Sequence, residues 1–487
     1  MDQEKKSLKS SVIHGFGTLI VREFFIKLFS FLGQVLLARL LAPSDFGVYV
    51  IIVFIINLFG LFSDIGLSLA IIQKKEVPTY LELSGAFWVK IFLSLGLMCL
   101  IWIFAPNVKV FYPAFIDTNV TMLRVFSVTL FLTSFRAIPI SLLERKIKYH
   151  LISLIDIIGI FVYYVVALVG AFLHIGVWSF IMGAVIKEII ETVMIYFIQP
   201  FIPQLTFFKN DIKKLIKFGV YIQGNSLVMF FIPSITPAIG GRLSGSYAVG
   251  LLDFANSIVS LPNIVAMNFA RVLFAGYSRI QEEKDLLSRS INKSVSMLAI
   301  VLYIFPVILM SFGAELVHFI YTEKWIAAVP SLYWFSAAVF FYPTITSLGQ
   351  VILSIGKSKE IFWATFIIAI LGWVGAYIFV KEFGFIGISM INLFIYFALY
   401  ASYIYILKKA NFEFSVISII VPKLIVVICT IVFSLFLNLI LPSTPPILII
   451  KLILSIITYI IFMLIFVKSD TLELFKLILD LIRLKRI

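Results

Sequence analysis

The chain has 487 residues, of which 62% are apolar and only 13% are charged, and its mean hydropathy is +1.10. A soluble globular protein is roughly half apolar and about a quarter charged. The composition therefore excludes a soluble enzyme, a coiled coil, a disordered protein and a secreted disulfide scaffold, and it predicts an all-α polytopic membrane protein. The formal net charge is +14. Basic loops facing anionic lipid are its expected cause, so we predict membrane lipid and not nucleic acid as a partner.

Apolar runs along the chain predict the membrane spans. A span with its loop uses roughly 33 residues, so this length predicts about 14 spans. Breaks at polar residues, Pro and Gly place them at 12–41, 45–72, 81–105, 121–141, 151–173, 177–199, 214–240, 246–270, 294–320, 329–355, 361–380, 385–407, 414–441 and 446–467. The tail 471–487 has apolar residues at helical spacing beside basic ones, which predicts an amphipathic helix lying on the inner membrane face or packed against the bundle.

The basic residues predict the orientation of these spans. With the amino terminus in the cytoplasm, 26 lysines and arginines fall in cytoplasmic segments, and the opposite side holds only Lys109, Lys324 and Lys381. The positive-inside rule therefore predicts that both termini are cytoplasmic. The first dozen residues have no small-residue cleavage site, so we expect no cleaved signal peptide.

The chain resembles itself at a period near 203–211 residues. Arg39 and Gly47 match Arg242 and Gly250 at an offset of 203, and 142–148 matches 353–359 at an offset of 211. This predicts two parallel six-helix lobes, 1–208 and 209–410, followed by two further spans in 411–470 and the cytoplasmic tail 471–487. Duplicated lobes are typical of alternating-access carriers.

Charged residues inside predicted spans are candidates for function because a charge at mid-bilayer is costly. Arg22, Lys90 and Arg136 have no oppositely charged partner at helical spacing on their own spans. They predict a cationic substrate cavity in the first lobe, unless acids on neighbouring spans such as Asp64 or Asp156 neutralise them. Arg39 joins this set, although it lies near a span end and can snorkel, as can Arg124, Arg242, Lys423 and Lys451.

Three aspartates in spans, Asp64, Asp156 and Asp253, are candidates for binding a coupling cation or proton. Lys187 and Glu191 have the i,i+4 spacing of a local ion pair. The four histidines show no metal-ligand spacing, and the two cysteines lie in apolar runs, so we expect no metal and no cofactor. Gly356-Lys357-Ser358 lacks the earlier glycine of a phosphate-binding loop. No long external loop is predicted that could hold a catalytic domain, so we expect no enzyme and no catalytic residue.

Several stretches resemble a known family. LLARLLAPSDFGVYVIIVFI (36–55), Asp64-Ile65-Gly66-Leu67, Pro139 with LLERKIKYHLISLIDIIG (142–159), and HIGVWSF (174–180) are similar to Wzx-like oligosaccharide flippases of the polysaccharide-transporter family. The resemblance covers most of the chain. It implies the multidrug/oligosaccharidyl-lipid/polysaccharide exporter fold and a lipid-linked oligosaccharide substrate. It also implies polyprenyl-diphosphate-linked repeat units, turned over in the cytoplasmic membrane for O-antigen, capsule or exopolysaccharide assembly, with a polysaccharide polymerase and chain-length machinery as partners.

Other functions remain open on the sequence alone. A lipid II flippase for peptidoglycan precursor also has fourteen spans and a cationic lumen. A drug/cation antiporter of the same superfamily prefers an acidic, aromatic cavity and usually has twelve spans. A membrane glycan polymerase or ligase would need the catalytic external loop that this chain lacks.

Overall fold

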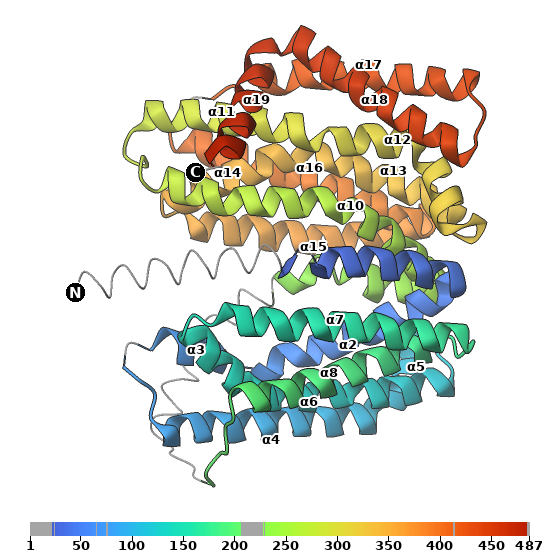
Figure 1. The fold of residues 1–487 in the computed structure, drawn as a ribbon, viewed down its shortest axis with the longest axis vertical. Helices are drawn as coiled ribbons and strands as arrows, with labels where there is room; N and C mark the ends of the chain where they lie inside the picture. Colours follow the sequence, from blue (N-terminus) through green and yellow to red (C-terminus); the bar gives the residue numbers. More distant parts are fainter. Residues whose placement is uncertain are drawn as a thin grey trace. The chain divides into compact units, whose positions relative to one another are not determined.

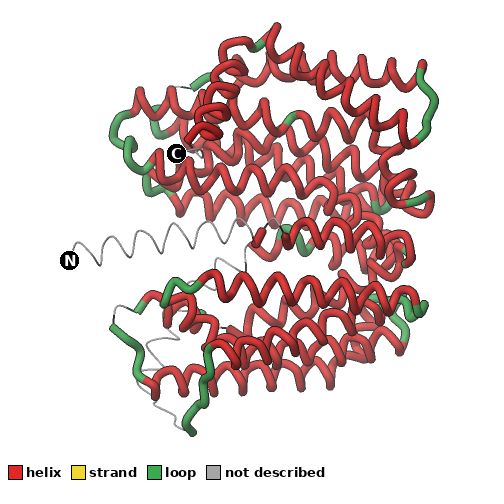
Figure 2. The backbone as a smooth tube through the Cα atoms, in the orientation of Figure 1, coloured by secondary structure: helices red, strands yellow, loops and turns green. Residues whose placement is uncertain are grey.

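The structure is a computed structural model that describes residues 22–23, 25–64, 66–74, 76–205, 227, 229–412 and 414–484, without the side chains of Asp64 and 477–484. Within these residues the chain consists of helices joined by loops and turns, and no strand is present (Figure 2). Eleven helical segments are long and apolar enough to cross a membrane. The protein is therefore an all-helical, multi-pass membrane protein.

The chain divides into two compact units, Met1–Gly250 and Leu251–Ile487. In the first, a helix over 25–40 precedes seven labelled helices, and the start of α10 closes the unit (Figure 1). The seven are α2 (Pro43–Asp64), α3 (Leu67–Gln73), α4 (Tyr80–Phe104), α5 (Val108–Phe111), α6 (Asp117–Arg145), α7 (Tyr149–Phe172) and α8 (Trp178–Ile198).

The long helix α10 (Gly241–Tyr277) continues into the second unit. The other helices of this unit are α11 (Lys284–Leu302), α12 (Ile304–Leu316), α13 (Val329–Ala338), α14 (Tyr342–Ser354), α15 (Ser358–Phe383), α16 (Ile386–Lys409), α17 (Val416–Ile440), α18 (Pro445–Phe466) and α19 (Lys468–Leu484). Figure 1 shows α17 and α18 running side by side as a hairpin.

Most predicted spans correspond to helices with similar limits. The span predicted at 81–105 is α4, that at 151–173 is α7, and that at 385–407 is α16. The span predicted at 294–320 begins ten residues too late, because the polar segment from Lys284 is already helical. The predicted spans 12–41 and 214–240 lie partly outside the described residues. The helix α8 carries Lys187, Glu188 and Glu191 and is not among the eleven apolar segments. The number of 14 spans stays a prediction.

Two glycines related by the predicted repeat face each other in the first unit. A Cβ atom at Gly47 would lie 1.7 Å from the carbonyl oxygen of Ser246, and one at Gly250 would lie 1.8 Å from that of Pro43. Pro43 and Ser246 are related by the offset of 203, as are Gly47 and Gly250. Each glycine therefore contacts the residue equivalent to the one that its counterpart contacts, and the contact between α2 and α10 is reciprocal. Only glycine permits this approach of two backbones, as small residues do at membrane helix crossings.

The same type of helix end occurs twice, at the end of α6 before α7 and at the end of α14 before α15. The N–H of Lys148 donates to Leu143 O after a left-handed residue at Ile147, and the N–H of Lys357 donates to Ile352 O after one at Gly356. Both are Schellman-type helix ends. Equivalent residues are 209 apart, so the offset of 211 predicted for this pair was wrong by two residues. The two-lobe repeat and its boundaries at 208 and 410 stay predictions.

Two lysines that we predicted to snorkel are buried instead. Lys423 on α17 is 1% exposed and lies 3.3 Å from Asp470 on α19, and Lys451 on α18 is fully buried 3.0 Å from Glu315 on α12. Each therefore connects a helix of the α17–α18 hairpin to another element. The charge is kept inside by a carboxylate partner, which removes the need to reach the membrane surface.

Candidate functional site

The first unit contains a cavity of about 920 Å³, which lies at the upper end of the size of ligand-binding pockets. Its lining comes from α2, α3, α4, α6, α7 and α8 and from Arg22. Four basic and three acidic side chains line it: Arg22, Lys90, Arg136, Lys187, Glu144, Asp156 and Glu188. The structure thus brings Arg22, Lys90 and Arg136, which come from three separate predicted spans, to one cavity.

Arg136 on α6 is held by two carboxylates from α8. Its Nη2 lies 2.8 Å from Glu188 Oε2, and its Nη1 forms an ion pair with Glu191. Lys187 Nζ also lies 3.2 Å from Glu188 Oε1 and 3.4 Å from Glu191 Oε1. The predicted local pair of Lys187 and Glu191 is therefore present, but it is part of a four-residue network that joins two helices.

A glycine on α7 leaves the space that the Glu191 side chain occupies. Glu191 is only 1% exposed, and a Cβ atom at Gly159 would lie 2.0 Å from its Oε1 atom. Because the glycine leaves this space free, a carboxylate fits between α7 and α8 behind the cavity. Its charge is compensated there by Arg136 and Lys187, as a buried carboxylate requires.

Arg22 and Lys90 also have partners in other elements. Arg22 Nε lies 2.8 Å from Asp156 Oδ2 on α7, which is the pairing with a neighbouring span that the sequence left open. Lys90 on α4 is 5% exposed, and its amine donates a 2.8 Å hydrogen bond to Ser68 Oγ on α3. The cationic substrate cavity stays a prediction, and the carboxylate pairing of Arg22 and Arg136 is the alternative that the sequence left open. The cavity lining contains both basic and acidic side chains. The carboxylates of Asp156, Glu188 and Glu191 hold Arg22 and Arg136 in fixed orientations.

Other parts of the lining are aromatic or hydroxylated. Tyr49, Phe126, Tyr163 and Tyr164 present rings, and the Tyr49 and Phe126 rings meet edge to face at 5.9 Å. Uncharged polar side chains come from α2, α3 and α6: Asn57, Ser63, Ser68, Thr129, Thr133, Ser134 and Ser141. Such a wall offers hydrogen bonds and flat apolar faces together, which is the combination that a sugar ring can use.

The described lining does not include the other predicted site residues. Arg39 is exposed on the helix over 25–40 and is not part of the described lining, so its grouping with the other cations is not reproduced. Asp253 belongs to α10 in the second unit. Asp64 is the last residue of α2, but its side chain lies outside the described residues. Among the three predicted aspartates, only Asp156 is seen in the lining.

The sequence analysis named Asp156 as a possible acidic partner but did not place the glutamates at the cavity. Glu144 and Glu188 both line it, and Glu191 lies behind it. A signal was present for α8, because Glu188 and Glu191 are three residues apart and therefore share a helix face. Two carboxylates against one Lys187 on that helix require a cation from another element, and Arg136 supplies it.

Residues 36–330 match the family described as polysaccharide biosynthesis protein. A membrane protein in the cps region of Klebsiella pneumoniae is 25% identical over 360 residues, which cover 72% of this chain and 73% of that protein. The lipopolysaccharide biosynthesis protein WzxC of Escherichia coli (strain K12) is 22% identical over 332 residues, covering 67% of this chain and 66% of the relative.

Two solved structures have a similar fold. The inward closed conformation of the lipid II flippase MurJ matches with a TM-score of 0.76 at 17% identity, covering 92% of this chain and 98% of that one. An inward-facing multidrug resistance transporter of the MATE family matches with a TM-score of 0.59 at 14% identity, covering 79% and 94%. The match of residues 36–330 covers more than half of the chain, and the chain therefore belongs to the polysaccharide biosynthesis protein family of Wzx-like membrane transporters.

Proposed function

We propose that this protein turns a polyprenyl-diphosphate-linked oligosaccharide from the inner to the outer leaflet of the cytoplasmic membrane, for the assembly of O-antigen, capsule or exopolysaccharide. The observation that carries the proposal is the first-unit cavity, in a chain whose family consists of polysaccharide transporters. It combines arginines, carboxylates, hydroxyls and aromatic rings. A glycan head group cannot enter hydrocarbon unaided, because its hydroxyls and phosphates would lose their hydrogen bonds.

In this mechanism the cavity replaces water around the glycan, while the polyprenyl tail stays in lipid. Arg22 and Arg136 offer planar donors to phosphate or sugar-acid oxygens. Since Asp156, Glu188 and Glu191 already occupy these donors, an anionic substrate has to share or displace them. That competition makes binding reversible, which a carrier needs on the releasing side. Alternating exposure of the cavity to the two leaflets would move the head group.

The test is complementation of a strain whose own polysaccharide flippase is deleted, scored by surface glycan. Wild-type protein should restore the glycan. A double variant, Arg22→Gln with Asp156→Asn, removes one ion pair without leaving a lone charge and should lower the restored amount at matched expression. Lys148→Gln removes an exposed cation outside the described lining and serves as the control.

The two alternatives from the sequence have their own arms in this test. The fold likeness to MurJ makes lipid II the more specific competitor, so the protein is also placed in a strain depleted of its lipid II flippase. Drug resistance is scored in a strain lacking its drug exporters. Rescue of lipid II-dependent growth, or drug resistance, together with failure for several surface glycans would contradict the proposal.

A further inference from the structure

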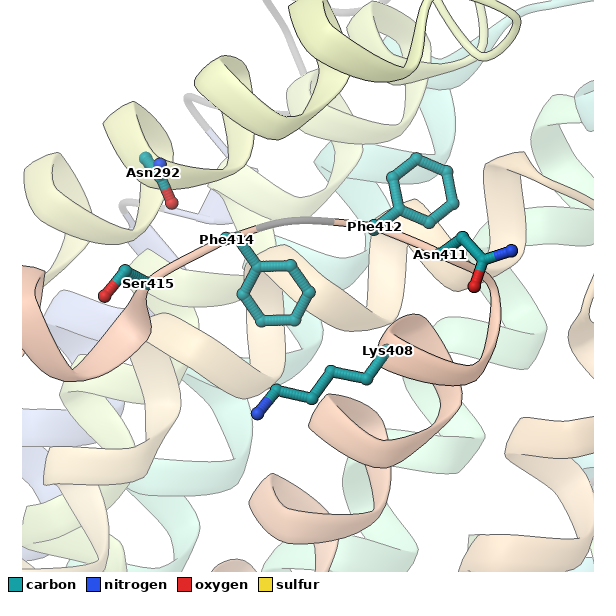
Figure 3. A pocket seen from close by; sticks show the side chains of 6 residues that line it. All are labelled: Asn292, Lys408, Asn411, Phe412, Phe414 and Ser415. Carbon is teal, nitrogen blue, oxygen red and sulfur yellow. The ribbon is translucent and has the colours of Figure 1, made fainter.

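A second cavity, of about 840 Å³, lies in the second unit where α16 ends and α17 begins. It is lined by Asn292 of α11, Lys408 of α16, and Asn411, Phe412, Phe414 and Ser415 of the connecting segment (Figure 3). None of these residues belongs to the site described above. The question is which kind of ligand this combination of side chains fits.

One wall of this cavity is held in place by a helix end. Asn411 has a φ of 59°, and its N–H donates to Lys408 O at 3.0 Å, while the N–H of Phe412 donates to Leu407 O at 3.2 Å. This is a Schellman motif with Asn in the left-handed position. Phe412 is 6% exposed and packs with Leu407 in a core that also includes Leu287 and Ile291 of α11. The start of the connecting segment is therefore anchored against α16 and α11.

Lys408 brings a positive charge to the cavity. Lys408 is exposed, and in the part of the chain that the structure describes it forms no ion pair, in contrast to the buried Lys423 and Lys451. In Figure 3 its side chain extends in the direction in which the segment runs from Asn411 to Ser415. The amine of Lys284 lies 5.8 Å from the centroid of the Phe412 ring. The ammonium group of Lys408 is thus the positive charge of the described lining, and Lys284 lies against the ring of Phe412 outside that lining.

The opposite wall carries an unsatisfied amide. The Oδ1 atom of Asn292 is buried, and no described group donates a hydrogen bond to it. A buried acceptor without a partner costs about 1–3 kcal/mol, which a hydroxyl of a bound ligand would offset. The ligand therefore needs an anionic group for Lys408 and a hydroxyl for Asn292.

The location of the cavity adds a third requirement. Both α16 and α17 are long and apolar enough to cross a membrane, so the segment between them lies at a membrane surface. Phe412 and Phe414 supply apolar lining at that depth. The positive-inside pattern predicts that this end faces the cytoplasm, where the leaflet is rich in anionic lipid.

We propose that this cavity binds the head group of an anionic glycerophospholipid that carries a hydroxyl, such as phosphatidylglycerol. The phosphate contacts Lys408, and a head-group hydroxyl donates to Asn292 Oδ1. A soluble phosphate ester such as glycerol 3-phosphate shares this chemistry but has no acyl chains to hold it at the membrane surface. The site is separate from the substrate cavity, so the proposal does not depend on the proposed transport function.

The test measures lipid binding to the purified full-length protein in neutral detergent by native mass spectrometry. Phosphatidylglycerol, phosphatidylcholine and glycerol 3-phosphate are added separately. Lys408→Gln should weaken phosphatidylglycerol binding roughly fivefold, as expected for one lysine near an anionic head group. Lys409→Gln is the matched control, because this neighbouring lysine is also exposed in the last turn of α16 but does not line the cavity. It should change binding less than twofold.

A second variant tests the hydroxyl contact. Asn292→Ala should reduce the preference for phosphatidylglycerol over phosphatidic acid, whose head group has no glycerol hydroxyls, while both variants keep the melting temperature of the wild type. Equal losses of phosphatidylglycerol binding in Lys408→Gln and Lys409→Gln would overturn the proposed site, because they would show that the lipid responds to general surface charge. Equal binding of phosphatidylcholine would overturn the anionic specificity, and tight binding of glycerol 3-phosphate would overturn the lipid as the source.

Discussion

At the scale of single residues, the cavity of the first unit is lined by paired charges. The sequence pointed to Arg22, Lys90 and Arg136 because nothing at helical spacing neutralises them, and the structure places all three in one lining. The sequence alone could not show that Asp156 and the two glutamates of α8 form ion pairs with these arginines, because such pairs depend on how the helices pack. Periodicity along one helix carries no information on its neighbour.

The first prediction concerns Arg136. Arg136→Ala leaves Glu188 and Glu191 with only Lys187 as a described partner. Breaking a buried ion pair from one side costs about 3–5 kcal/mol, so this variant should unfold at a clearly lower temperature than the wild type. Thermal unfolding of the purified protein in detergent measures this. Arg136→Ala combined with Glu191→Gln should recover part of the loss, and no recovery would show that the two residues do not act as a pair.

At the scale of elements, helix packing depends on glycines that the sequence singled out for another reason. Gly47 and Gly250 were identified as a repeat match, and in the structure they are where α2 and α10 meet backbone to backbone. The predicted repeat thus located a contact that hydropathy alone does not reveal. The burial of Lys423 and Lys451 was not predictable in the same way, because their partners lie far along the chain at Asp470 and Glu315.

The second prediction tests this crossing. Gly47→Ala and Gly250→Ala should each lower the melting temperature and the restored surface glycan, since overpacking a close contact costs typically about 1–3 kcal/mol. Gly96→Ala on α4 is the control, because a Cβ there meets no atom within 4 Å. The same stability in all three variants would contradict a tight crossing at Gly47 and Gly250.

The third prediction concerns α19, whose first turns contact α11 and α17. Asp470 accepts a hydrogen bond from Ser296 and forms an ion pair with Lys423, and Lys293 pairs with Glu473. The start of the C-terminal helix therefore packs against other helices of the second unit, which is one of the two alternatives that the sequence left open for the tail. Burial alone would raise the pKa of Asp470, but the hydrogen bond from Ser296 and the charge of Lys423 together lower the pKa below its ordinary value of 3.8.

Because the pKa of Asp470 is lower in the folded state, its contribution is complete above pH 3.8 and is lost as the pH falls through the lowered value. Hydrogen exchange of the α19 backbone should therefore stay slow from pH 7 to about pH 4. Asp470→Asn should speed this exchange already at pH 7. Glu473→Gln breaks only an exposed pair worth about 0–1 kcal/mol and should have little effect. Equal effects of the two variants would contradict the role given to Asp470.

At the scale of the whole molecule, composition and hydropathy predicted the class of the protein, and the family match confirms the resemblance noted in residues 36–180. Eleven apolar spanning segments are present in the described residues, and most agree with predicted spans to within a few positions. The predicted span at 177–199 corresponds to α8, although its charged residues keep this helix out of the eleven apolar segments. The mixed charge of the cavity was less predictable, because it depends on tertiary contacts between α6, α7 and α8.

The most direct measurement of the central claim is flipping in vesicles made with the purified protein. A polyprenyl-diphosphate-linked oligosaccharide is placed in the inner leaflet, and its arrival outside is followed with a glycan-modifying enzyme added to the exterior. The account predicts that wild-type protein and Lys148→Gln accelerate arrival equally, and that the Arg22→Gln, Asp156→Asn double variant is slower. Arrival no faster than in protein-free vesicles, or the same rate in the double variant as in the wild type, would contradict the role assigned to this cavity.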